Sequence, residues 1–156
     1  MCPPPADLVL LTVLGLWALA LAVDDVRHRR VLNLALLPVA SFALAARICG
    51  GWPGCELSWL PGLWGALIGL LFWLPGYLLK RSGAGDVKCA MTMGLVLGGM
   101  QALEANLLGF LFLGMQAAVF YALGRRELRM PAVPALSLGF IIQLAGGPWW
   151  LGAAGA

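Results

Sequence analysis

The sequence predicts an all-α membrane protein built as a bundle of about six transmembrane helices. The 156 residues are 62% hydrophobic and only 11% charged, with a mean hydropathy of +0.91, whereas soluble domains carry about 25% charged residues. The few charges also divide the chain into six uncharged runs. These runs are Leu8–Val23, Val31–Ala46, Leu57–Leu79, Cys89–Leu103, Ala105–Gly124 and Met130–Ala156.

The lengths of these runs suit a bilayer. A helix needs about 20 apolar residues to cross the hydrocarbon core, within a range of about 17–25. Three runs reach that length, and Lys or Arg side chains at the ends can extend the three shorter ones by snorkelling. The first run follows MCPPPAD, which has no positively charged n-region. No A-x-A site precedes a hydrophilic mature domain, and further apolar runs follow at once, so we expect this run to be the first span. We expect a single integral-membrane domain over residues 1–156.

The basic residues predict the orientation. Nine of the ten Lys and Arg residues fall in the connections after the first, third and fifth runs, and Arg47 alone stands at the start of a connection on the other side. Positive residues favour the cytoplasmic side, so both termini are expected outside. The net charge of +3 follows from this bias, and no nucleic-acid partner is expected.

The scarcity of metal-binding and nucleophilic residues excludes several chemistries. The single histidine, His28, cannot build a His-rich zinc site, and no G-x-S-x-G sequence is present. The four cysteines form no C-x-x-C pair, so neither a metal nor a cofactor is expected. Cys49 and Cys55 share one outer connection, where they could form a disulfide or remain two unpaired residues.

Two glycine pairs have the small-xxx-small spacing that lets membrane helices approach closely. They are Gly65 with Gly69, and Gly94 with Gly98. In a chain with 21 glycines the pattern does not by itself identify which helices meet.

Three of the seven acidic residues need an explanation beyond solvation. Asp7, Glu56 and Glu104 fall at outer ends or connections, where we expect water to solvate them, and Glu127 lies among arginines. The remaining three, Asp24, Asp25 and Asp86, lie at the predicted inner membrane boundary. Ionisable groups at that depth are costly and suggest function, although acids at helix ends can also serve only as caps.

The stretch RSGAGDVKCAMTMG, residues 81–94, places Asp86 after Gly83 and Gly85. Glycine permits unusual backbone conformations and close approach of another chain, as needed if an extended peptide lies against the acid. Asp86 could also be the N-cap of the fourth helix. Two carboxylates held close cannot both ionise easily, so one could activate water while the other donates a proton, as in aspartic proteases.

The two acidic segments resemble a known family. SGAGDVK resembles the G-x-G-D signature of intramembrane aspartyl proteases, and in particular that of type IV prepilin leader peptidases. DVRHRRVLN, residues 25–33, is similar to the family's second signature, with Leu32 in place of its proline. MPAVPALSLGF, residues 130–140, looks like the family's last loop-to-helix segment.

The resemblance implies a six-helix inner-membrane peptidase whose site faces the cytoplasm. It would cleave the leader of type IV-like prepilins or pseudopilins after a glycine, with Asp25 and Asp86 as the catalytic pair. Gly83 and Gly85 would position Asp86, while Asp24 and Lys88 would have lesser supporting roles.

This chain lacks the insert with two C-x-x-C pairs of bifunctional members. It resembles the short, peptidase-only forms of tight-adherence (Flp-type) pili, so no methyltransferase activity is expected. The alternative function is a non-enzymatic membrane carrier or a pilus or secretion assembly scaffold, using the aspartates for ion handling.

Overall fold

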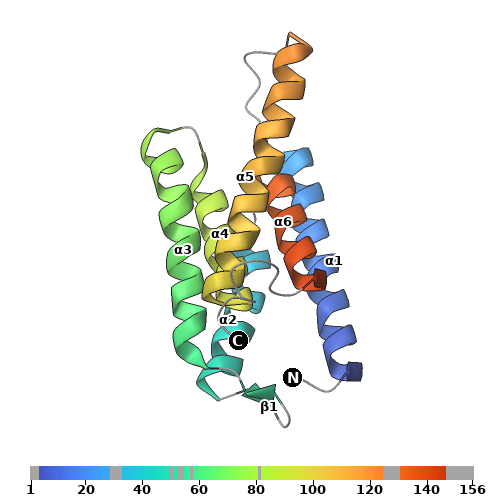
Figure 1. Ribbon diagram of the computed structural model, residues 1–156, viewed down its shortest axis with the longest axis vertical. Helices are drawn as coiled ribbons and strands as arrows, with labels where there is room; N and C mark the ends of the chain where they lie inside the picture. Colours follow the sequence, from blue (N-terminus) through green and yellow to red (C-terminus); the bar gives the residue numbers. More distant parts are fainter. Residues whose placement is uncertain are drawn as a thin grey trace.

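A computed structural model describes residues 4–28, 33–49, 51–52, 55–56, 58–80, 82–124 and 131–146. Over these residues the chain forms six helices and one small antiparallel ladder (Figure 1). The ladder pairs Gly51 with Glu56 and Trp52 with Cys55. The elements in order are α1 (Pro4–His28), α2 (Asn33–Ile48), β1 (Gly51–Trp52), β2 (Cys55–Glu56), α3 (Trp59–Leu78), α4 (Ala84–Leu97), α5 (Gly99–Ala122) and α6 (Val133–Gly146).

The helices have the lengths and surfaces of a membrane bundle. Within the described residues, Leu8–His28 of α1, α3 and α5 are long and apolar enough to cross a bilayer, and Leu34–Ile48 and α6 are shorter apolar helices. Large apolar side chains such as Leu16, Leu71 and Leu111 are exposed on the outside of the bundle, where lipid would cover them. The predicted all-α membrane fold is confirmed.

The G-x-G-D motif and the small ladder lie at opposite ends of the bundle. The C-terminal end of α1 and the α3–α4 turn lie at one end, towards which α5 also runs, and β1 and β2 lie at the opposite end (Figure 1). Arg27 and Lys80 belong to the first end. Arg29, Arg30, Arg81 and the arginines at 125, 126 and 129 lie outside the described residues, so the side that faces the cytoplasm stays a prediction.

Helix α4 lies in the middle of the packing. Its buried residues join those of α1 and α6 in one apolar core, which includes Leu14, Ala18, Leu21, Val87, Cys89, Ala90, Met93, Val133, Leu136 and Phe140. A helix that is apolar on most of its faces belongs in the interior of a bundle, and α4 occupies that position.

The glycine pairs meet where α3 crosses α4. A Cβ atom on Gly65 would collide with the backbone of Gly94, and one on Gly69 would collide with the backbone of Ala90. Gly139 makes the same kind of approach from α6 to Ala105 and Gly109 of α5. Small residues thus bring the helix backbones into direct contact, as in other membrane helix pairs.

The boundary between the fourth and fifth helices differs from the prediction. The uncharged runs placed it beside Glu104, but the chain turns at Gly98, whose φ of +92° favours glycine. Glu104 instead lies within α5, is only 7% exposed, and accepts a hydrogen bond from the side-chain nitrogen of Gln143 at 2.5 Å. The expectation that Glu104 is solvated is therefore wrong, because a partner on α6 takes the place of water.

Arg47, predicted to stand at the start of a connection, is buried. It lies in the last turn of α2 and is only 7% exposed. Its guanidinium donates to the carbonyl oxygens of Leu95 and Val96 at 2.8 and 2.9 Å, and to that of Ser58 at 2.9 Å. The last carbonyls of a helix lack partners within the helix, so Arg47 caps the C-terminal end of α4.

The cysteine at the end of α2 is not bridged. Cys49 is exposed and carries a free thiol, so the possible disulfide with Cys55 is absent from this structure.

Candidate catalytic site

Asp25 lies on the buried face of α1, near its C-terminal end. Leu14, Ala18 and Leu21 precede it at helical spacing, and all four residues are buried, Asp25 being 6% exposed. Its carboxylate oxygen Oδ2 accepts a hydrogen bond from the backbone N–H of Val133 at 3.2 Å. Asp25 thus points into the bundle, towards the first residue of α6.

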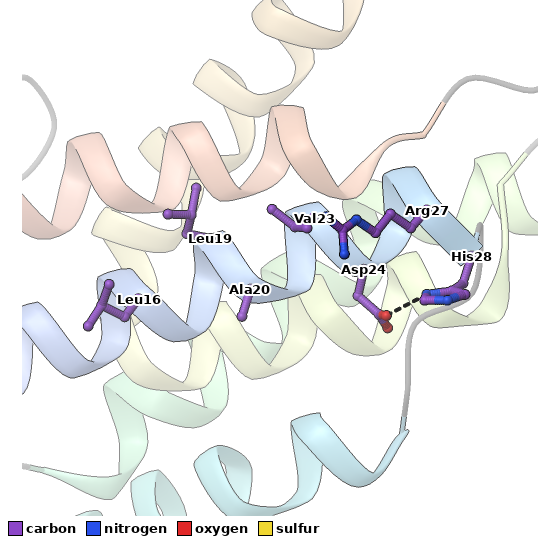
Figure 2. Close-up of a pocket in the computed structure, with 7 residues that line it drawn as sticks. All are labelled: Leu16, Leu19, Ala20, Val23, Asp24, Arg27 and His28. Atoms are coloured by element: carbon purple, nitrogen blue, oxygen red, sulfur yellow. Dashed lines mark hydrogen bonds and ion pairs between the residues drawn. The ribbon is translucent and has the colours of Figure 1, made fainter.

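Asp24 points in a different direction. Neighbouring residues of a helix are rotated by about 100°, and the side chain of Asp24 is 32% exposed. Its Oδ1 pairs with Nδ1 of His28 at 2.7 Å. Figure 2 shows this pair at one end of a shallow hollow along α1, whose other lining residues are Leu16, Leu19, Ala20, Val23 and Arg27.

Asp86 lies in the first turn of α4 and is half-buried. Its Oδ2 accepts the backbone N–H of Gly83 at 2.8 Å, and its own N–H donates to the Gly83 carbonyl at 3.1 Å. Gly83 is therefore the N-cap, and Asp86 is the third helical residue, reaching back to it. The expectation that Asp86 could be the N-cap is corrected by this geometry.

The two glycines before Asp86 have ordinary backbone conformations here. Gly83 is extended, with φ −83° and ψ 156°, which any residue can adopt. Gly85 lies in the first turn of α4. In this structure the contribution of Gly83 is its amide, rather than the backbone freedom that we expected of it.

The turn before this motif is tied to the end of α3. The N–H of Ser82 donates to the carbonyl of Gly76 at 3.1 Å. Lys80 adopts a left-handed conformation, with φ +56°. The Ser82 hydroxyl is buried without a hydrogen-bond partner. The hydrogen bond between Ser82 and Gly76 holds the start of α4 against the end of α3.

Cys89 lies on the buried face of α4. It lies one helical turn after Asp86 and is completely buried. Leu21, one turn before Asp25, and Val87, next to Asp86, belong to the same buried core as Cys89, so the acidic ends of α1 and α4 lie at the same end of the bundle. Lys88, the neighbouring motif residue, has an exposed side chain.

This arrangement can support general acid–base chemistry. Two carboxylates at the same end of the bundle, one buried and one half-buried, can divide the roles of proton donor and acceptor. Within the residues that the structure describes, no group of three His, Cys, Asp or Glu side chains is arranged to hold a metal ion. His28 is exposed, and its Nδ1 atom pairs with Asp24.

The sequence did not identify two features: the Val133 amide that donates to Asp25 and the buried Cys89 thiol one turn after Asp86. The segment M-P-A-V-P, residues 130–134, resembled a family motif, and this resemblance pointed to the region around Val133. It could not identify the Val133 amide itself, because every residue except proline carries a backbone N–H. Cys89 could have been noted from its position one turn after Asp86 on an apolar helix.

Comparison with known proteins gives one match. Residues 11–123 match the sequence profile of the Type IV leader peptidase family. The matched region contains Asp25 and Asp86 and ends before α6. No curated protein and no solved structure matches the chain. Because the family profile spans well over half of the sequence, the chain belongs to the Type IV leader peptidase family.

Proposed function

We propose that this membrane peptidase is an aspartic endopeptidase in which Asp25 and Asp86 form the catalytic pair. Family membership supplies the general function, cleavage of type IV leader peptides. The observation that carries the aspartic mechanism is that one buried core includes Leu21, one turn before Asp25, and Val87, the residue after Asp86. This shared core supports a common site for two acids from distant parts of the sequence.

In the proposed reaction, one carboxylate accepts a proton from water as the water oxygen attacks the scissile carbonyl carbon. The other carboxyl group donates its proton to the carbonyl oxygen. The tetrahedral intermediate then collapses and the C–N bond breaks. The first carboxyl group gives the proton that it took from water to the leaving nitrogen, and the second carboxylate recovers a proton from a hydroxyl group of the intermediate. In each aspartate one carboxylate oxygen accepts a hydrogen bond from a backbone amide, which restricts the orientation of the carboxylate.

We propose Flp-type (tight-adherence) prepilins or pseudopilins as substrates, cut after a glycine at the cytoplasmic face of the inner membrane. Support comes from the sequence, because the chain has no C-x-x-C pair and thus lacks the cysteine-bearing insert of bifunctional members. In this proposal Gly83 and Gly85 shape the start of α4. Lys88 and Asp24 supply charge near the pair.

The test is the cleavage of a candidate Flp-type prepilin in cells that also express the peptidase. The mature pilin is analysed by mass spectrometry of its N-terminus. We expect the wild-type protein to give a product that begins directly after the glycine, and Asp86→Asn to give only the full-length prepilin. Equal amounts of the two proteins in the membrane fraction serve as the control. Full cleavage by Asp86→Asn would contradict the aspartic mechanism.

A further inference from the structure

We propose that the backbone amide of Val133, at the start of α6, is the positioning group for Asp25, and that it fixes one carboxylate oxygen so that the other faces the reaction. This inference rests on the proposed function, because it assigns the role of α6 in that same site. Val133 lies beyond residues 11–123, the part of the chain that matches the family profile.

The first support is the contact itself. The Val133 N–H donates to Oδ2 of Asp25 at 3.2 Å, between residues 108 positions apart in the sequence. Asp25 is 6% exposed and Val133 is completely buried. A hydrogen bond from a buried amide to a carboxylate has little competition from water, so it restricts the orientation of the carboxylate.

The second support is the sequence around the amide. Val133 stands between Pro131 and Pro134, and proline has no N–H. From Pro131 to Pro134, only Ala132 and Val133 can therefore donate a backbone hydrogen bond. The first N–H groups of a helix have no acceptor within the helix, so the Val133 donor is available to Asp25. The positive end of the α6 dipole also favours a carboxylate there.

The third support is that α6 is held in place on two sides. Gly139 packs against the backbone of Ala105 and Gly109 on α5. Phe140 meets Trp17 of α1 edge-on, with ring centroids 6.2 Å apart, and the Trp17 indole donates to the Ala35 carbonyl of α2 at 2.8 Å. A donor carried on a well-packed helix can hold a reacting group in a fixed orientation.

The decisive experiment removes the N–H and keeps the side chain. Replacing Val133 with its α-hydroxy acid, by nonsense suppression in vitro, turns the amide into an ester. The same replacement at Leu138, an exposed residue of α6, is the matched control because it removes an ordinary helical donor. With a candidate prepilin in nanodiscs, we expect the Val133 ester to lower kcat by about 10- to 100-fold. KM should be unchanged, and the Leu138 ester should act like the wild type.

A pair of ordinary substitutions gives a second test. Val133→Pro removes the N–H at a helix position that tolerates proline, whereas Val133→Ala retains it. We expect the kcat of Val133→Pro to fall as in the ester, and that of Val133→Ala to stay within about threefold of the wild type. Equal losses in the two variants would indicate that the side chain matters instead, and would overturn the inference.

An infrared measurement separates this inference from the proposed function. The carboxylate bands of Asp25 are isolated by subtracting the spectrum of Asp25→Asn, and we expect them to shift in the Val133 ester but not in the Leu138 ester. If the wild-type protein cleaves no prepilin, the proposed function fails. The inference about Val133 is then tested only by whether the Asp25 carboxylate bands shift in the Val133 ester. Unshifted bands, or a Val133 ester with wild-type kcat in an active enzyme, would overturn it.

Discussion

At the scale of single residues, the neighbours Asp24 and Asp25 have different surroundings. Asp25 lies inside the bundle with a backbone donor from α6, whereas Asp24 lies on the outer side of α1 with His28. The family resemblance favoured Asp25 over Asp24 on motif alignment only. The rotation between consecutive helical residues gives a physical reason why two adjacent acids can have unequal roles.

These surroundings lead to a prediction for prepilin cleavage. We expect Asp25→Asn to abolish cleavage, because it removes a proposed acid–base group. Asp24→Asn should retain most activity, since it disturbs only an exposed pair whose energy is small. The measurement is the fraction of mature pilin, by mass spectrometry, at equal amounts of peptidase in the membrane. Equal losses in the two variants would exclude the proposed difference in role.

Buried polar side chains are a second feature at this scale. Glu104 is paired with Gln143, Asn106 accepts the indole N–H of Trp73 at 2.9 Å, and Arg47 binds carbonyl oxygens. Leaving such groups without partners would cost several kcal/mol each, roughly, in an apolar medium. Their partners come from other helices, so only the packed bundle could identify them.

At the scale of helices, the contact between α3 and α4 depends on glycine. Gly65 and Gly94 leave no room for a Cβ atom where the two backbones meet. The same two helices are joined by the turn that precedes Asp86. Close packing of α3 and α4 therefore supports both the bundle and the start of the G-x-G-D motif.

We expect Gly94→Ala to lower the free energy of unfolding by about 1–3 kcal/mol, because the added methyl group forces the helices apart. Gly114→Ala on α5 is the matched control, since nothing lies within 4 Å of a Cβ atom there. It should be neutral, or stabilising by up to about 1 kcal/mol. Thermal unfolding in detergent measures both, and equal stability of the two variants would contradict the proposed packing role.

The helices themselves were largely predictable, whereas one boundary was not. Over their described parts the uncharged runs are largely helical, because hydropathy is a sum over neighbouring residues that the sequence contains, but the run Cys89–Leu103 includes the turn at Gly98. The break between α4 and α5 was misplaced because a charged residue, Glu104, was taken as the boundary. Gly98 forms the actual turn, and its role depends on a backbone conformation that composition does not reveal.

At the scale of the whole molecule, the basic residues predict which end faces the cytoplasm. Lys80 is at the end of the bundle that holds the G-x-G-D motif, and the free thiol of Cys49 is exposed near the opposite end. Positive residues near span ends are retained on the cytoplasmic side. The proposed site would then meet the leader peptide on the side where prepilins are made.

Labelling of single cysteines tests this orientation. Each variant retains one thiol, either native Cys49 or one introduced by Lys80→Cys, and all other cysteines are replaced. We expect a membrane-impermeant maleimide, added to intact spheroplasts, to label Cys49 and not the Lys80→Cys thiol. Both should react after permeabilisation. The reverse labelling pattern would place the site outside and contradict the proposed localisation.

The sequence alone determined the membrane class, the six helices and the two acidic motifs, because these depend on local composition and spacing. Tertiary structure decided which glycine faces meet, why Glu104 and Arg47 can be buried, and that the α6 amide reaches Asp25. The physical reason is that a buried polar group must find a partner inside the protein. That partner lies far away in the sequence, and only the packing of the helices brings the two together.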